Sequence, residues 1–191
     1  YRFQWVSPIL VSRHDANVVY HGSQFVHRTR DGGMSWETIS PDLTTNTPAH
    51  QVASGGALNN DITGVEIFNT VFAIAEDQRD TRTLWAGTDD GRVHLTRNGG
   101  TNWTEVTPPG MPRFGTVEEI TLSAHQAGRA YVAVQAYRMD DFRPYIFRTD
   151  DYGRTWARIA DGTNGIPADH PVRAFAEDPR VPALLYAGTE Y

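Results

Sequence analysis

The chain has 191 residues, of which 39% are hydrophobic, and a formal net charge of -6. That charge and the absence of a basic stripe argue against nucleic acid as a partner, because phosphate binding needs clustered cations. No window approaches about 18 consecutive apolar residues, so no membrane span is expected, and with no cysteine a disulfide framework and a thiolate metal site are both excluded.

In chain order, the predicted elements are short strands that recur as a unit. Each unit contains an aliphatic strand, which usually ends in glycine followed by serine or threonine (residues 18–23, 84–88, 130–136 and 184–189). In three units a short alternating strand follows (25–29, 92–96 and 145–149), then a glycine-rich turn, then a strand that begins at a tryptophan (36–39, 103–106 and 156–159). Repetition at this spacing indicates a repeat architecture.

The glycine-rich turns share one motif, Thr-x-Asp/Asn-x-Gly-x-x-Trp, at residues 29–36, 96–103 and 149–156. The glycine supplies the positive φ that a tight hairpin needs, and the Asp or Asn side chain accepts hydrogen bonds from amides across the turn. The tryptophan is expected to bury its ring between neighbouring sheets. These structural positions are Asp31, Gly33, Trp36, Asn98, Gly100, Trp103, Asp151, Gly153 and Trp156.

Four antiparallel strands per unit make one blade of a β-propeller, so the sequence predicts an all-β fold. We place blades at residues 1–43, 62–107 and 117–160, and a half blade at 172–191. Because propellers typically close with about 4 to 8 blades, these three and a half blades leave open edges. The expected partner is the remainder of the same propeller, or another chain that covers those edges.

The three turns and the connecting segments 86–92, 137–145 and 185–191 resemble the sortilin-like BNR (Asp-box) repeat proteins, above all large secreted bacterial members labelled glycosyl hydrolase or sortilin-like. The resemblance covers nearly the whole chain. It implies a β-propeller in an extracellular or periplasmic protein, with the signal peptide outside this chain. Related propellers include peptide receptors, sialidases and xyloglucan-cleaving hydrolases, so the resemblance leaves binding and catalysis both open.

In a propeller, the turns between second and third strands share one face with the loops that join successive blades, opposite the glycine-rich turns. On this face we predict ligand contacts from two turns whose aromatic, carboxylate and guanidinium groups suit glycan or peptide recognition. The predicted ligand-binding residues are Asp89, Asp90, Tyr137, Arg138, Asp140, Asp141 and Arg143. Two plainer interpretations stay open: a tight hairpin turn at 89–91, and a solvated, self-paired loop at 137–143.

Three further carboxylates, Asp61, Glu66 and Glu118, flank the starts of inner strands. They either point into the channel or pair with arginines at its rim, and Glu190 and Tyr191 join the same face. The seven histidines, at positions 14, 21, 27, 50, 94, 125 and 170, show no metal-ligand spacing such as His-x-x-x-His. Neither a metal nor a cofactor is therefore expected.

Our first hypothesis is a non-catalytic binding or scaffold propeller of a larger extracellular protein, which recognises glycan or peptide. The alternative is a glycoside hydrolase, sialidase-like or xyloglucanase-like, with two carboxylates about 5 to 10 Å apart at the channel mouth. Its candidate carboxylates are Asp61, Asp89, Asp90, Asp140 and Asp141. The Arg-Ile-Pro phrase expected of a sialidase is absent. A third hypothesis is a purely structural subunit of an extracellular assembly.

Overall fold

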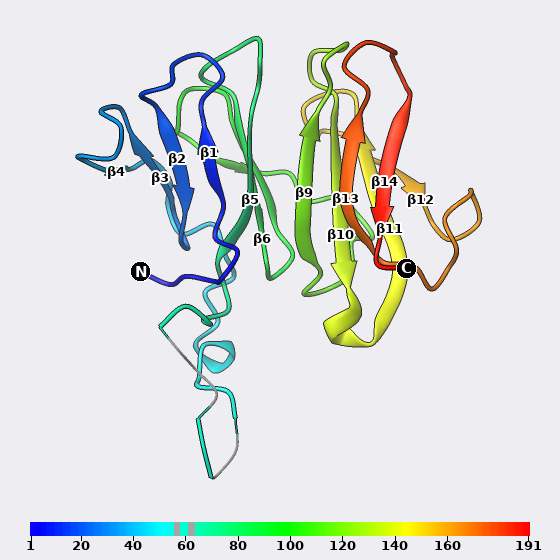
Figure 1. Ribbon diagram of the computed structural model, residues 1–191, viewed down its shortest axis with the longest axis horizontal. Helices are drawn as coiled ribbons and strands as arrows, with labels where there is room; N and C mark the ends of the chain where they lie inside the picture. Colours follow the sequence, from blue (N-terminus) through cyan, green and yellow to red (C-terminus); the bar gives the residue numbers. More distant parts are fainter. Residues whose placement is uncertain (56–57, 61–63) are drawn as a thin grey trace.

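Three complete sheets and one half sheet follow one another along the chain (Figure 1). The computed structural model describes residues 1–55, 58–60 and 64–191. Strands that are consecutive in sequence pair antiparallel, in the orders β1-β2-β3-β4, β5-β6-β7-β8, β9-β10-β11-β12 and β13-β14. The described part of the chain holds no α-helix, only the 3₁₀ turns η1 (Pro48–His50) and η2 (Tyr137–Met139), and no helix able to cross a membrane. This architecture confirms the predicted all-β propeller of three and a half blades.

Each complete blade consists of four short strands. The first blade has β1 (Ile9–Val11), β2 (Val19–Gly22), β3 (Val26–Thr29) and β4 (Glu37–Thr38). The second has β5 (Val71–Glu76), β6 (Leu84–Thr88), β7 (Val93–Thr96) and β8 (Thr104–Glu105). The third has β9 (Thr116–Leu122), β10 (Ala130–Ala136), β11 (Asp141–Thr149) and β12 (Ala157–Ala160), and the half blade has β13 (Val172–Glu177) and β14 (Leu185–Thr189). Ile62, the expected start of the second blade, lies outside the described residues.

The first strand of each blade lines a common channel. β5 contacts both β1 and β9, and β9 contacts β13, so the four inner strands lie next to one another. They border a cavity of about 470 Å³. Apolar side chains from all four strands line this cavity, namely Leu10, Ile74, Ile120 and Phe175. The blades are thus arranged around one channel.

The three glycine-rich turns, which we call the box turns, share one set of hydrogen bonds. In each, the hydroxyl of the first threonine accepts the N–H of the glycine at position 33, 100 or 153, at 2.9, 3.1 and 2.9 Å. The side chain at position 31, 98 or 151 accepts the N–H four residues further on, at 2.9, 2.9 and 2.8 Å. Hydrogen bonds from Ser35 and Thr155 lower the pKa of Asp31 and of Asp151 to about 2. These carboxylates therefore hold the turns.

The tryptophans of the box turns lie in two different environments. Trp103 donates from Nε1 to the carbonyl of Ile39 at 2.8 Å, so it reaches the end of the preceding blade. Trp156 likewise donates to the carbonyl of Val106 at 2.9 Å. Trp36 instead is 48% exposed and donates to a carbonyl of its own turn. The expected burial between sheets therefore holds for Trp103 and Trp156 only, because the described residues contain no blade on the other side of Trp36.

A tyrosine of one blade also bonds to a glutamate of the next inner strand. Tyr20 donates to Glu76 and Tyr131 donates to Glu177, each at 3.0 Å. Burial raises the pKa of both tyrosines to about 12. At the same position of the second blade, Trp85 replaces tyrosine and belongs to the apolar core. The same position of each blade thus makes the contact to its neighbour. The contact is polar in the first and third blades and apolar in the second.

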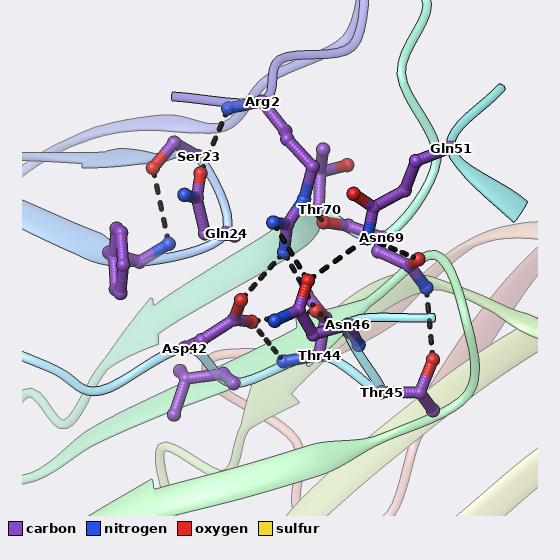
Figure 2. Close-up of polar contacts among 12 residues, drawn as sticks. Arg2, Ser23, Gln24, Asp42, Thr44, Thr45, Asn46, Gln51, Asn69 and Thr70 are labelled. Carbon is purple, nitrogen blue, oxygen red and sulfur yellow. Dashed lines mark hydrogen bonds and ion pairs between the residues drawn. The ribbon is translucent and has the colours of Figure 1, made fainter. Parts of the chain in front are cut away.

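The long loop between the first two blades is fixed by Arg2 (Figure 2). Its guanidinium donates to the carboxylate of Asp42 at 2.7 Å, the hydroxyl of Thr44 at 3.0 Å and the carbonyl of Asn69 at 2.9 Å. Asn69 in turn donates to the hydroxyl of Thr45 at 3.0 Å. One network therefore joins the N-terminal segment to both ends of the loop.

The turn from β6 to β7 is tied to the same loop by two buried carboxylates. Asp89 is 1% exposed and accepts the N–H and the hydroxyl of Thr70 at 2.8 and 2.9 Å. Asp90 is 3% exposed and accepts the N–H and the hydroxyl of Thr45, both at 2.7 Å, and the amide of Asn69 at 2.6 Å. Both carboxylates therefore act as links between chain segments.

Gly33 and Gly100 share a left-handed backbone conformation, so substitutions at these two positions test how closely the blades approach each other. Gly100 has φ +95° and Gly33 has φ +99°, but a Cβ at Gly100 would lie 2.5 Å from the carbonyl oxygen of Ile39, whereas a Cβ at Gly33 meets no atom within 4 Å. Gly33→Ala should cost about 1–2 kcal/mol for the left-handed backbone alone. Gly100→Ala should cost about 1–3 kcal/mol more, because the blades must move apart. Urea denaturation measures both, and equal losses would contradict a blade contact at Gly100.

Asp89 should make stability depend on pH. Burial raises the pKa of its carboxyl to about 7, against the opposing effect of the hydrogen bonds from Thr70. The pKa of an aspartate in an unfolded chain is about 3.9. Between about pH 4 and pH 7, unfolding therefore releases a proton that the folded protein keeps, so this carboxyl lowers the free energy of unfolding as the pH rises.

Asp89→Asn should remove this dependence and keep an acceptor for the amide of Thr70. We expect the stability of the wild type relative to the variant to decrease from about pH 4 to about pH 7 and to level off above that. Urea denaturation of both proteins across this range measures the difference. If the difference stays constant, the carboxyl of Asp89 is ionised in the folded protein throughout.

Candidate functional site

Three inner strands carry a β-bulge near their first residues, on the side of the molecule that holds the β6-β7 and β10-β11 turns. The pairing of β5 with β6, of β9 with β10 and of β13 with β14 each skips one residue there. The skipped residues are Phe72, Glu118 and Arg173. A bulge redirects a side chain and is frequent next to functional sites. We therefore take this end of the channel, the channel mouth, as the candidate site.

Polar and aromatic side chains gather around two of the bulges. Arg173 forms an ion pair with Glu190 at 3.6 Å, and its guanidinium lies 5.6 Å from the centre of the Tyr137 ring. The guanidinium of Arg138 lies 5.5 Å from the centre of the same ring. We call this group the mouth cluster; its members are Glu118, Gln135, Tyr137, Arg138, Arg173 and Glu190.

The carboxyl of Glu118 is half-buried, and its pKa is raised. Burial is the main cause, while the positive charges of Arg173 and Arg138 act in the opposite direction. A raised pKa keeps the carboxyl protonated closer to neutral pH than that of an ordinary glutamate. The surroundings of Glu118 therefore favour its protonated form.

Gln135 is the most deeply buried member of the mouth cluster, at 1% exposure. Its Oε1 accepts the N–H of Tyr137 at 3.3 Å. Its amide also lies close enough to Glu118 to act as a weak hydrogen-bond donor, which lowers the pKa of that carboxyl. Among the described residues, however, no acceptor meets Nε2 of Gln135 at hydrogen-bonding geometry. Nε2 of Gln135 is thus a buried donor beside the bulge that lacks a well-formed hydrogen bond.

A small pocket opens next to the mouth cluster. Its volume is about 190 Å³, and it is lined by Tyr137, Phe142, Pro171, Glu190 and Tyr191. Aromatic rings beside a carboxylate suit a ligand that has both an apolar face and hydroxyl groups. The pocket is therefore compatible with a single sugar ring.

The turn at residues 137–143 divides into an open part and a self-paired part. Tyr137 and Arg138 belong to the mouth cluster, and Asp140 follows them as an exposed residue with φ 59°. Asp141 instead accepts two hydrogen bonds from the Arg143 guanidinium, at 2.8 and 2.7 Å, and one from the hydroxyl of Tyr145, at 2.7 Å. The bonds from Arg143, and then that from Tyr145, hold the pKa of Asp141 well below its usual range. Asp141 and Arg143 therefore brace the hairpin.

Asp89 and Asp90 do not join the mouth cluster. Their carboxylates are occupied by the long loop, and among the described residues no hydrogen bond or ion pair connects them to the 137–143 turn. The carboxylates of the two turns therefore differ in their surroundings, and ligand contact from both turns stays a prediction. Both carboxylates are thus engaged in internal hydrogen bonds, and Asp90 also borders a cavity of about 380 Å³.

Two other predicted carboxylates lie apart from the cluster. Glu66 pairs with Gln4 in an isolated bridge and accepts the Nε1 hydrogen of Trp5 at 2.8 Å, so it holds the N-terminal segment. Asp61 lies outside the described residues. Among the residues that the structure covers, no group of three His, Cys, Asp or Glu side chains could hold a metal ion.

Gln135 and Arg173 were not predicted from the sequence. Gln135 lies near the end of an apolar strand and belongs to no recognisable motif. Nothing in the sequence distinguished Arg173 from the other arginines. A signal was nevertheless present, because Val71, Val117 and Val172 occupy the same place in three blades and each precedes the skipped residue. Aligning the blades on these valines would have brought Arg173 next to Glu118.

Comparison with known proteins identifies sequence relatives only at a distance. No model of a protein family matches the chain. Among curated proteins, the chain is similar to the oligoxyloglucan-reducing end-specific xyloglucanase of Emericella nidulans, with 27% identity over 166 residues. The match covers 84% of this chain but only 17% of that enzyme.

Solved structures agree on the fold. The structure of an ancestral GH74 enzyme matches 98% of this chain with a TM-score of 0.68 and 20% identity. That of the GH74 xyloglucanase from Xanthomonas campestris matches 95% with a TM-score of 0.66 and 17% identity. This chain spans 22% and 26% of the two enzymes, respectively. These likenesses show the β-propeller fold and do not single out the sortilin-like repeat proteins.

Proposed function

We propose that this chain contributes blades to the propeller of a glycoside hydrolase that acts on xyloglucan or a related β-glucan outside the cell. The identity of 27% over 166 residues with a xyloglucanase carries the proposal. It favours the hydrolase alternative over the non-catalytic scaffold that was our first hypothesis. Because the chain spans 17% of that relative, the proposal assigns it one portion of the glycan-binding surface, at the channel mouth.

The hydrogen bonds and the burial of the carboxylates limit which of them could be catalytic. Glycoside hydrolysis needs a proton donor and a second carboxylate that acts as base or nucleophile. Asp89, Asp90 and Asp141 are already bonded within the protein. Glu118, whose pKa burial raises, is suited to hold the proton, and the exposed Asp140 is free to act as the second carboxylate. We therefore place Glu118 and Asp140 first among the described residues.

Non-catalytic recognition of glycan or peptide remains the second candidate. One observation favours it: three of the four described carboxylates predicted for hydrolysis hold loops and turns together. A surface built in this way needs only the aromatic and charged groups around Tyr137 to bind a ligand. The two candidates differ in whether the bound glycan is cleaved.

Cleavage is tested with the full-length protein that contains this chain. The protein is incubated with xyloglucan and, separately, with unbranched cellulose oligosaccharides, and new reducing ends are measured. We expect release from xyloglucan. Glu118→Gln and Asp140→Asn should each slow it by about 100-fold or more, because each removes a group that transfers a proton or stabilises the reacting sugar. Thermal melting should stay unchanged, since neither side chain holds a segment in place.

Asp15→Asn is the matched control. This exposed carboxylate lies in the loop between β1 and β2, at the opposite end of the channel, and bonds only locally to Asn17. It should leave product release unchanged. Binding of xyloglucan without any new reducing ends would establish the second candidate, and the absence of both binding and cleavage would refute the proposed function.

A further inference from the structure

The bulges of β9 and β13 bring two opposite charges to one place. β9 contacts β13, and both strands skip a residue at the same level, so Glu118 and Arg173 leave their strands side by side. The charge of Arg173 is the largest effect that opposes burial at the carboxyl of Glu118, which shows that the two groups act on each other. No direct ion pair within 4.0 Å forms between them, whereas Arg173 does pair with Glu190 at 3.6 Å. Glu118 therefore keeps hydrogen-bonding capacity for another partner.

Gln135 adds a donor that Glu118 engages only weakly. Its Nε2 is buried without an acceptor among the described residues, although its Oε1 is bonded. A buried polar atom in this state costs free energy, so native proteins keep few of them without a functional reason. An oxygen atom of a ligand at the channel mouth would satisfy this donor.

The charges and rings of the cluster narrow the class of ligand. Two carboxyl groups, Glu118 and Glu190, stand beside two guanidinium groups, Arg138 and Arg173, so the cluster offers charges of both signs whether or not Glu118 is protonated. A strongly charged ligand would meet a like charge at close range, whereas hydroxyl groups can donate to the carboxylates and accept from the guanidinium groups. The aromatic side chain of Tyr137 also lines the neighbouring pocket, where it adds apolar surface.

The neighbouring pocket limits the size of that ligand. Its volume of about 190 Å³ lies below the range of about 300–1,000 Å³ that holds drug-sized molecules. One sugar ring is a suitable occupant, and the rest of a glycan chain would extend along the open mouth. Phe72, the bulged residue of the preceding blade, lies on that side of the channel.

We propose that the mouth cluster is a subsite for one neutral sugar ring, in which Glu118, Arg173 and Gln135 bond to its hydroxyls and Tyr137 packs against its apolar face. The choice of a sugar rests on the proposed function, but the site itself is defined by the bulges and by the buried Nε2 of Gln135, which lacks a well-formed hydrogen bond. Neutrality of the ligand is the feature that the presence of both signs of charge in the cluster adds.

Calorimetric titration of the full-length protein tests the subsite. The probes are a neutral xyloglucan oligosaccharide and an anionic oligogalacturonate of the same length, and every protein carries Asp140→Asn so that the neutral probe stays intact. We expect the neutral probe to bind more tightly. Arg173→Gln and Tyr137→Ala should each weaken its binding by about tenfold, which corresponds to one hydrogen bond to a charged group or one ring contact.

Two matched variants separate recognition from folding. Tyr137→Phe keeps the ring and should bind almost as the parent does, and Arg30→Gln removes an exposed arginine of the box-turn face and should have no effect. Melting temperatures of all variants should agree with that of the parent. Unchanged affinity in Arg173→Gln and Tyr137→Ala would overturn the subsite and leave the proposed hydrolase standing. Tighter binding of the anionic probe, or no binding of either saccharide, would also overturn the subsite.

Discussion

The structure depends on the packing of one blade against the next. A four-stranded antiparallel meander has two faces to cover, and in this chain the neighbouring blade covers them. At the interface Trp103 reaches the carbonyl of Ile39 at 2.8 Å, and Gly100 lets that carbonyl come so close that a Cβ would stand 2.5 Å from its oxygen. Trp156 repeats the contact in the third blade. The box turn is thus both a tight hairpin and the device that sets the distance between sheets.

Blade packing also creates the candidate site, because it aligns the inner strands. Glu118 and Arg173 lie in different blades, yet a bulge at the equivalent position of each inner strand brings both to the channel mouth. Gln135 lies in β10 and Tyr137 in the turn that follows it, so both belong to the same blade as Glu118. A site assembled from equivalent positions of adjacent blades can change its chemistry by single substitutions, since the bulge is a property of the backbone pairing. The second blade, with Phe72 at this position, illustrates such a change.

Most of the acidic side chains near the mouth have a structural task. Asp42 bonds to Arg2, Asp90 holds the long loop, and Asp141 braces its own hairpin through Arg143 (Figure 2 shows the first of these contacts). This use of carboxylates explains why an abundance of acids on the ligand face does not by itself indicate catalysis. It leaves Glu118 and Asp140 as the groups on which the proposed hydrolase chemistry depends.

The sequence by itself determined the repeat, the strands and the all-β propeller, because these rest on local rules: threonine and glycine close each box turn, and a tryptophan follows at fixed spacing. The tertiary structure alone decided which polar groups are available. The long loop between the first two blades buries Asp89 and Asp90, which lie after β6. Trp36 stays exposed, whereas the neighbouring blade covers Trp103. Arg173 comes close to Glu118 only because their blades pack together. Burial and pairing depend on partners distant in the chain, and no local pattern encodes them.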